Sequence, residues 1–208
     1  MIKKIYRRTV GYIMQTKLYR YLLKHIIPYI RFTTYYTSLR GWKYHVMYDK
    51  LEPGDIILTI DKKKLTTILI PGAFSHAAMC VSLNKKWEVS EMTHSDYTKS
   101  CFFDICKESD RVVILRCKKC TYEQVMSAIK KCKSFENAEY DSQFSLGISA
   151  LYCSELIYAS YENNLLKASL EDFVGLGRPY ISPVGLYNAK NVKVIIDSDL
   201  IRENDYEI

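Results

Sequence analysis

The sequence predicts a mixed domain of short strands and helices, preceded by a basic helical extension. The chain of 208 residues is long enough for one ordinary domain and a modest extension. Hydrophobic residues make up 48% and charged residues 25%, as in folded globular proteins. Short apolar runs bounded by turn residues predict the strands, and apolar residues at helical spacing predict the helices. The composition excludes a disordered tail, a fibrous repeat and a disulfide-rich miniprotein.

The distribution of charge divides the chain near residue 49. Residues 1–50 contain eleven Lys and Arg residues, nine tyrosines and a single acidic residue, Asp49. The remaining residues hold slightly more acidic than basic side chains, although the net charge of the whole chain is +7. We therefore expect two parts, a basic Tyr-rich extension at residues 1–49 and a nearly neutral domain at residues 50–208.

An amphipathic helix is expected within the extension, over residues 9–27 and ending near Pro28. A basic helix of this kind suits an anionic membrane surface, a nucleic acid or a protein partner. It suits equally well a helix that packs its apolar face on the domain and leaves its basic side chains in water. The aromatic stretch at residues 31–48 favours neither helix nor strand. The predicted apolar face consists of Ile13, Met14, Leu18, Tyr21, Leu22 and Ile26.

Basic residues interrupt every apolar run of the extension, at Lys17, Arg20 and Lys24. A secretion signal needs an uninterrupted apolar core, and a membrane-spanning helix needs roughly 18 apolar residues. Neither is expected here, which predicts a cytoplasmic or virion-associated protein without a transmembrane segment. A basic, acid-poor start is also typical of transit peptides.

The domain is predicted to begin with a turn at Pro53-Gly54, followed by a buried strand. Its next two strands should form a hairpin, because a short polar segment separates them. Thr121 is a candidate N-cap for the helix that begins there. The strands are expected at residues 56–60, 74–83, 86–92, 111–116 and 192–196, and the helices at residues 121–135 and 151–161.

The seven cysteines cannot all pair within the chain, which favours a reducing compartment and mostly free thiols. Cys117 and Cys120 form a C-x2-C pair, and Cys101, Cys106 and Cys132 lie within reach. Zinc ribbons need two such pairs joined by tight turns, so this spacing favours scattered thiols over a metal site. Neither of the glycine-rich phosphate-binding motifs occurs, and no nucleotide is expected.

Cys153 and His76 are the best candidates for a reactive pair. Cys153 is expected in the first turn of a helix, where the positive end of the helix dipole stabilises a thiolate. His76 lies in a predicted strand among small residues, which leave room for another side chain to approach. Taken singly, each is more often an ordinary core residue than a catalytic one.

Glu91 is the best candidate for a third polar group that orients the imidazole, because a carboxylate accepts its N–H and stabilises its cation. A hairpin turn centred on residues 84–85 places Thr93 opposite His76, with Glu91 as a diagonal neighbour on the same face. A turn centred one residue earlier places Glu91 itself opposite. A register shifted by one residue would present His94 instead.

The order of these pieces resembles the YiiX/YebB-like group, the circularly permuted branch of the NlpC/P60 papain-like cysteine hydrolases. The resemblance spans roughly residues 51–197 and leaves out the basic extension. It rests on the segments PGDIIL at 53–58, FSHAAM at 74–79, WEVSE at 87–91, YCSELI at 152–157 and GRPYISP at 177–183.

The resemblance implies an α+β papain-like domain with a small antiparallel sheet, in which the histidine strand precedes the cysteine helix. It implies Cys153 as nucleophile, His76 as base and Glu91 as third polar group, without a metal or cofactor. The expected reaction is cleavage of an amide bond in a peptidoglycan-type stem peptide. The alternatives are a lipid thioesterase or acyltransferase and a non-catalytic virion or structural interaction protein. A phage or viral protein would reach a cell wall without a secretion signal.

Overall fold

The computed structural model describes residues 16–30, 39, 41–64, 67, 72–83, 88–147, 149–172 and 177–205. The predicted helical residues 9–15 and the predicted hairpin turn at residues 84–85 lie outside these ranges. Within them, no helix combines the length and the hydropathy that crossing a bilayer requires.

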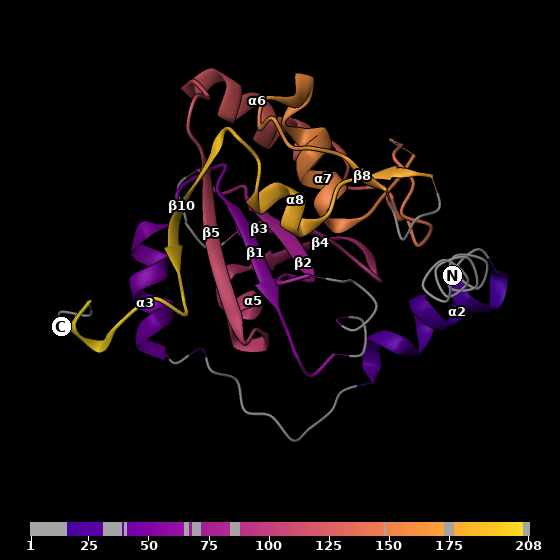
Figure 1. The fold of residues 1–208 in the computed structure, drawn as a ribbon, viewed down its shortest axis with the longest axis horizontal. Coiled ribbons are helices and arrows are strands. Elements are labelled where there is room, and N and C mark those ends of the chain that lie inside the picture. The colour runs from indigo at the N-terminus through magenta and orange to yellow at the C-terminus, as the bar shows by residue number, and fades with distance from the viewer. Residues whose placement is uncertain are drawn as a thin grey trace, which may run out of the picture.

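Among the described residues, six strands form one antiparallel sheet in the order β10-β5-β1-β2-β3-β4 (Figure 1). The three central strands are largely apolar and buried, whereas β4 is a polar edge strand. The six are β1 Ile56–Ile60, β2 His76–Cys80, β3 Glu88–Thr93, β4 Asp96–Cys101, β5 Arg111–Cys117 and β10 Val192–Asp197.

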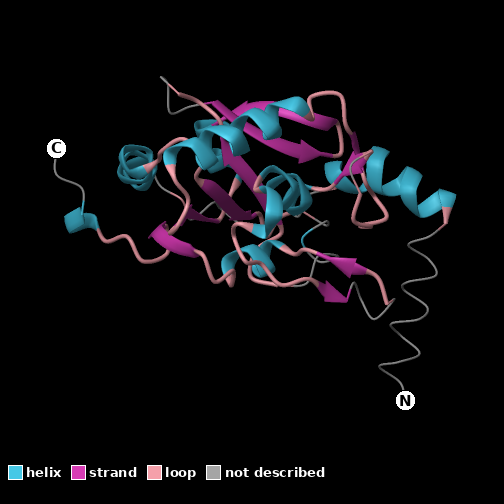
Figure 2. Ribbon diagram, turned by 90° about the horizontal axis from the view of Figure 1, so that it is seen from above, coloured by secondary structure: helices cyan, strands magenta, loops and turns pink. Residues whose placement is uncertain are grey.

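Helices cover both faces of this sheet (Figures 1 and 2). Two short strand pairs flank them: β6 Glu139–Tyr140 runs parallel to β7 Ala150–Leu151, and β8 Glu171–Asp172 runs antiparallel to β9 Pro179–Tyr180. The helices are α2 Lys17–His25, α3 Gly41–Lys50, α5 Phe102–Glu108, α6 Tyr122–Ser134, α7 Cys153–Ser160 and α8 Pro183–Tyr187, with 3-10 turns η1 Ile27–Tyr29, η2 Glu162–Asn164 and η4 Glu203–Asp205.

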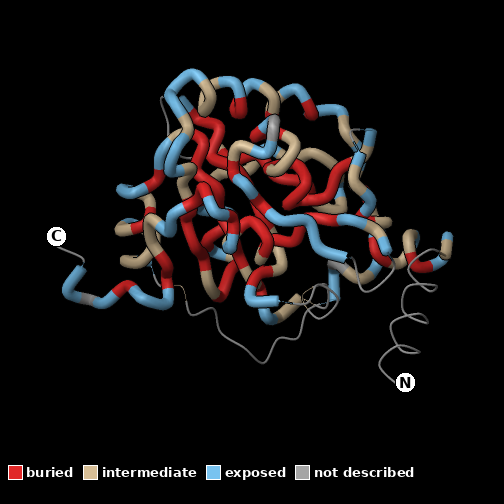
Figure 3. The backbone as a smooth tube through the Cα atoms, turned by 45° about the horizontal axis from the view of Figure 1, so that its top comes forward, coloured by how far each residue is buried: buried red, intermediate tan, exposed pale blue. Residues whose placement is uncertain are grey.

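Buried side chains of the described residues form two cores, one on each face of the sheet. The buried residues gather in the interior of the molecule, and exposed residues lie around its outside (Figure 3). Successive residues of a strand point to opposite faces, so Ile56 and Leu58 enter one core and Ile57 enters the other. Helices α6, α7 and α8 close the first core, and helices α3 and α5 close the second. The central strands are therefore buried on both sides, which explains their continuous apolar sequences.

The turn that leads into β1 needs a glycine and a buried ion pair. Gly54 has φ +83°, and a Cβ there would lie 2.4 Å from a methyl carbon of Val125. The next residue, Asp55, is fully buried and accepts hydrogen bonds from Arg116 Nε at 2.7 Å and Nη2 at 2.8 Å. Tyr161 donates a hydrogen bond to the carbonyl of Gly54 at 2.6 Å, which ties this turn to the end of α7.

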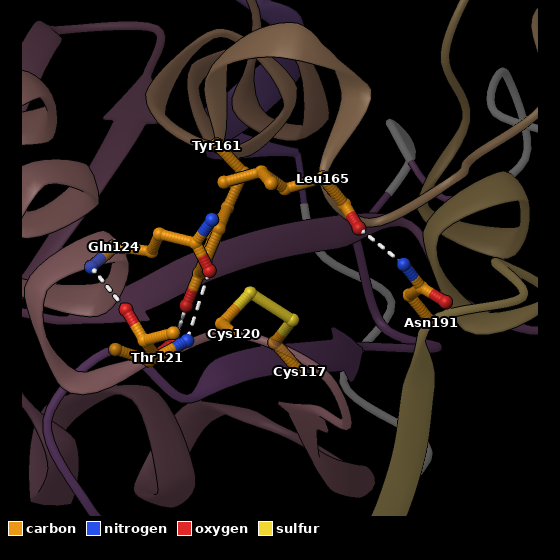
Figure 4. Close-up of a disulfide and its surroundings, with 8 residues drawn as sticks. Cys117, Cys120, Thr121, Gln124, Tyr161, Leu165 and Asn191 are labelled. Carbon is orange, nitrogen blue, oxygen red and sulfur yellow. Dashed lines mark hydrogen bonds between the residues drawn. A yellow bond between two sulfur atoms is a disulfide. The ribbon is translucent and has the colours of Figure 1, made fainter.

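Most predicted elements are present with shifted ends. The strand at Ile56–Ile60 is confirmed, and helix α6 has the predicted N-cap, Thr121, in a reciprocal capping box with Gln124 (Figure 4). The helix predicted from residue 151 begins at Cys153, because residues 150–151 pair with β6 instead. The predicted strand at residues 74–83 is paired over His76–Cys80. Helices α3, α5 and α8 and strand β4 were not predicted.

The extension is helical in its described part, where Thr16 caps α2 and Tyr19 and Leu23 reach the first core. Helix α3, which also lies in the predicted extension, packs against α5 and β10 through the buried side chain of Met47. The domain boundary at residue 49 stays a prediction. Helix α3, although it lies before that boundary, packs against elements of the domain predicted at residues 50–208.

Cys117 and Cys120 form a disulfide (Figure 4). Strand β5 ends at Cys117 and α6 begins just after Thr121, so the intervening turn brings the two Cα atoms within 5.6 Å. The other five cysteines, all within the described ranges, are free. Most of the thiols are therefore free, as expected, and only the C-x2-C pair, expected as two free thiols, is oxidised.

Candidate active site

Cys153 is the first residue of helix α7. The preceding Tyr152 keeps an extended backbone as the N-cap. The carboxylate of Glu155, one turn into the helix, accepts the N–H of Gly147 at 2.6 Å and that of Tyr152 at 3.5 Å. The N–H of a first helical residue has no carbonyl partner within its helix, so the positive end of the helix dipole lies at the Cys153 thiol.

The segment around β9 holds this helix end in place. Ser154 donates a hydrogen bond to the carbonyl of Ile181 at 2.8 Å, and the N–H of Ile181 donates to the Tyr152 hydroxyl at 2.8 Å. Cys153 itself is only 3% exposed. The thiol is therefore fixed by contacts on both sides of it in the sequence.

His76 is the first residue of β2, and Glu91 lies on the neighbouring strand β3. The register pairs Ala78 with Glu91, which places Thr93 opposite His76 and Glu91 on its diagonal. The register with Thr93 opposite His76 is one of those that the sequence left open. Nε2 of His76 lies 2.6 Å from Oε2 of Glu91, and Ser100 on β4 donates a hydrogen bond to Oε1 of the same carboxylate.

The Cys153 thiol lies beside the His76 imidazole, and each stabilises the charged form of the other. Since Glu91 occupies Nε2, Nδ1 is the nitrogen left for the thiol. Burial opposes charge on His76, but Cys153 and Glu91 raise its pKa to about 10. Burial also opposes the Cys153 thiolate, but His76 and the N–H groups of Ala77 and Ser154 bring its pKa below the ordinary thiol value. The arrangement favours a thiolate–imidazolium pair.

Glu91 remains ionised in this setting. Burial alone would raise the pKa of its carboxyl group, but the hydrogen bond and charge of His76, and the hydrogen bond from Ser100, lower it. The structure thus brings Cys153, His76 and Glu91 together, as the sequence suggested.

These three residues line a cavity of about 580 Å³. Charged side chains of both signs line it, among them Asp61, Lys64 and Glu108. Nζ of Lys64 lies 3.0 Å from Oε2 of Glu108 and 4.0 Å from Oδ2 of Asp61. Apolar lining comes from Leu23, Met92 and Ile105. The volume suits a ligand of small-molecule or short-peptide size.

Several cavity residues were not predicted from the sequence. Tyr140 on β6 lines the cavity with Cys153, and burial raises its pKa well above the ordinary tyrosine value, so its hydroxyl stays a proton donor. Leu23 and Tyr29 belong to the extension. These three residues reach the cavity through contacts between distant parts of the chain, which no local sequence pattern predicts.

His94, the alternative orienting residue, does not contact His76. It follows the end of β3, and its Nε2 lies 3.3 Å from the hydroxyl of Tyr29. The two rings meet edge to face. His94 therefore lines the same cavity on the side of the extension.

The remaining buried thiols differ from Cys153 in the direction of their pKa shifts. Burial raises the pKa of Cys80 and Cys132 to about 12, and that of Cys106 also rises. None of these three has an imidazole among the groups that shift its pKa. Low thiolate character is therefore expected at these positions, in contrast with Cys153.

A search of curated proteins finds no match to this chain. Among solved structures, YiiX from Escherichia coli O157:H7 is similar, with a TM-score of 0.61 and 19% sequence identity. The similarity covers 71% of this chain and 97% of that one. At this level of identity the likeness concerns the fold.

The YiiX structure is described as that of a metalloprotein. Within the described part of the present chain, no group of three or more His, Cys, Asp and Glu side chains is arranged to hold a metal ion. The Cys117–Cys120 disulfide also removes the two thiols of the C-x2-C pair as ligands. The described residues therefore do not fit a resident metal.

A family profile described as "Permuted papain-like amidase enzyme, YaeF/YiiX, C92 family" matches residues 50–179. This range contains Cys153, His76 and Glu91 and more than half of the chain. The match confirms the resemblance and, with the solved structure, the predicted α+β papain-like fold with an antiparallel sheet. The chain therefore belongs to the C92 family of permuted papain-like cysteine amidases.

Proposed function

We propose that Cys153, His76 and Glu91 form the catalytic triad of a hydrolase that cleaves an amide bond in a peptidoglycan-type stem peptide. The observation that carries this proposal is the pairing of Cys153 and His76. The thiol raises the pKa of the imidazole, and the imidazole lowers the pKa of the thiol, so each favours the charged form of the other. A thiol of lowered pKa beside an imidazole that a third group orients is the arrangement that nucleophilic catalysis needs.

Acylation begins with attack of the Cys153 thiolate on the carbonyl carbon of the scissile amide. The N–H of Cys153, which as the first residue of α7 has no carbonyl partner within that helix, donates a hydrogen bond to the oxyanion that forms. The His76 imidazolium then gives its proton to the leaving amine, and the C–N bond breaks. The product is an acyl-enzyme thioester and a free amine.

Deacylation uses the same residues in reverse. His76, now neutral, takes a proton from water as the hydroxide attacks the thioester carbonyl. The Cys153 thiolate leaves, and the carboxylic acid departs. Glu91 accepts a hydrogen bond from the Nε2–H of His76 throughout and stabilises the imidazolium in each half-reaction.

The charged lining of the cavity supports a polar peptide substrate. Lys64 can meet a substrate carboxylate, and Asp61 and Glu108 can meet an ammonium group. Stem peptides carry both kinds of charge close to their amide bonds. A long acyl chain has no polar group to offer to these side chains.

The test is an assay of the purified full chain on stem-peptide fragments, with acyl-lipid amides and thioesters in parallel, read by mass spectrometry. The proposal predicts cleavage at one amide bond of a peptide, loss of cleavage in Cys153→Ser, and retention in the control Cys101→Ser, whose thiol is partly exposed. Turnover of lipids alone would overturn the peptide assignment. Turnover that survives Cys153→Ser would overturn the triad.

A further inference from the structure

The segment at residues 16–30 presents two different sides to its surroundings. Its buried side chains, Tyr19 and Leu23, reach the first core. Its outer side carries large apolar groups in water: Leu18 is 67% exposed and Tyr21 58%, and Ile26 and Ile30 are also exposed. Figures 1 and 2 show α2 projecting at one end of the molecule, away from α3.

The charge of this segment is entirely positive. It contains Lys17, Arg20, Lys24 and His25 and no acidic residue. Lys17, Lys24 and His25 are exposed beside the apolar side chains. Nζ of Lys24 lies 3.4 Å from Oδ1 of Asp96. Both side chains are exposed, so their mutual attraction is weak in water. Mixed basic and apolar side chains on one short helix are typical of segments that lie in a membrane interface.

The same segment forms one wall of the active-site cavity. Leu23 and Tyr29 line the cavity, and Tyr29 contacts His94 on the adjacent wall. A surface that binds the outer side of this segment therefore comes next to the cavity that contains Cys153.

We propose that residues 16–30 dock the protein on an anionic lipid surface. Lys17, Lys24 and His25 would face the lipid phosphates, and Leu18, Tyr21 and Ile26 would enter the boundary between headgroups and acyl chains. A nucleic acid would satisfy the basic groups but would leave the aliphatic side chains in water. The exposed Leu and Ile side chains therefore favour lipid. This inference concerns where the protein binds and does not depend on the proposed reaction.

The test is co-sedimentation of the full chain with phosphatidylcholine vesicles, with and without about 30% phosphatidylserine, at low salt. The expected result is binding at least about tenfold stronger to the anionic vesicles. Lys17→Gln/Lys24→Gln should weaken it by more than about tenfold, since each lysine near an anionic surface contributes roughly fivefold. Lys118→Gln/Lys119→Gln, which removes two exposed lysines elsewhere, is the matched control.

The apolar contribution is tested with Leu18→Asp against Leu200→Asp, since Leu200 is 75% exposed on another part of the chain. Leu18→Asp should reduce vesicle binding at least about tenfold, and Leu200→Asp should not. Equal losses in the two variants, binding to neutral vesicles as strong as to anionic ones, or retention on duplex DNA without vesicle binding would each overturn the proposal. Vesicle binding is measured without substrate, so its failure leaves the hydrolase assay untouched.

Discussion

Nε2 of His76 lies 2.6 Å from Oε2 of Glu91, and the other oxygen of that carboxylate accepts a hydrogen bond from Ser100. Three neighbouring strands thus contribute one residue each to a single chain of polar contacts. Because both carboxylate oxygens are held, the imidazole is fixed in the orientation that leaves Nδ1 for Cys153. The sheet therefore sets the geometry of the pair before any substrate binds.

Glu91→Gln should lower kcat/KM by about 10²- to 10⁴-fold, because an amide nitrogen facing Nε2 favours the wrong tautomer and cannot balance the imidazolium charge. Ser100→Ala should cause a smaller loss, since the carboxylate remains. The check is the kinetics of both variants together with the His76 titration by NMR. A His76 pKa unchanged in Glu91→Gln would contradict the orienting role of the carboxylate.

The pH dependence of activity should be bell-shaped. Activity should rise at a pH below the ordinary thiol pKa, because the pKa of Cys153 is lowered, and should fall as His76 loses its proton near pH 10. Thiolate absorbance near 240 nm, followed against pH in the wild type and in Cys153→Ser, measures the lower limb directly. Thiolate formation only above pH 8.5 or so would contradict an ion pair in the resting protein.

Glu155 should make stability depend on pH near neutrality. Burial raises its pKa to about 7, although the N–H groups of Gly147 and Tyr152 oppose this. A carboxyl whose folded pKa exceeds its unfolded value favours folding below the unfolded pKa, and this contribution is lost as pH rises through about 7. The loss amounts to no more than about 3 kcal/mol.

The measurement for this prediction is urea unfolding at pH 5 and pH 8 in the wild type and in Glu155→Gln. Stability should fall more between these pH values in the wild type, because the variant has no group to ionise at this position. The same pH dependence in both proteins would show that Glu155 does not titrate as described.

Arg116→Met should destabilise the fold by about 3 kcal/mol, because it leaves the Asp55 carboxylate buried without its partner. Burial already raises the pKa of Asp55 despite the arginine. The double variant Arg116→Met/Asp55→Asn should regain part of the loss, as unfolding in urea would show. Equal stability of the single and double variants would mean that the pair is not coupled.

The sequence predicts those elements whose pattern is local. The run at Ile56–Ile60 is buried on both faces and reads as a strand, and Thr121 marks the start of α6. Strand β4, an edge strand of sequence DYTKSC, has no apolar alternation, and α5 follows it without an intervening turn, so neither element has a local pattern.

The same distinction applies to the candidate site. Cys153 and His76 were recognisable from residue type and position within one element. Glu91 depended on the hairpin register, because its strand alone admits several pairings. Tyr140 and Tyr29 could not be predicted, because they reach the cavity through contacts between segments far apart in the chain.

The most direct test of the central claim is iodoacetamide labelling of the native protein at pH 6, read by peptide mass spectrometry, in the wild type and in His76→Ala. An ordinary thiol with a pKa of about 8.5 is almost fully protonated there and reacts slowly. We predict that Cys153 labels far faster than the other free cysteines and that this advantage disappears in His76→Ala. Labelling of Cys153 no faster than that of Cys101, or an advantage that persists without His76, would contradict the thiolate–imidazolium pair.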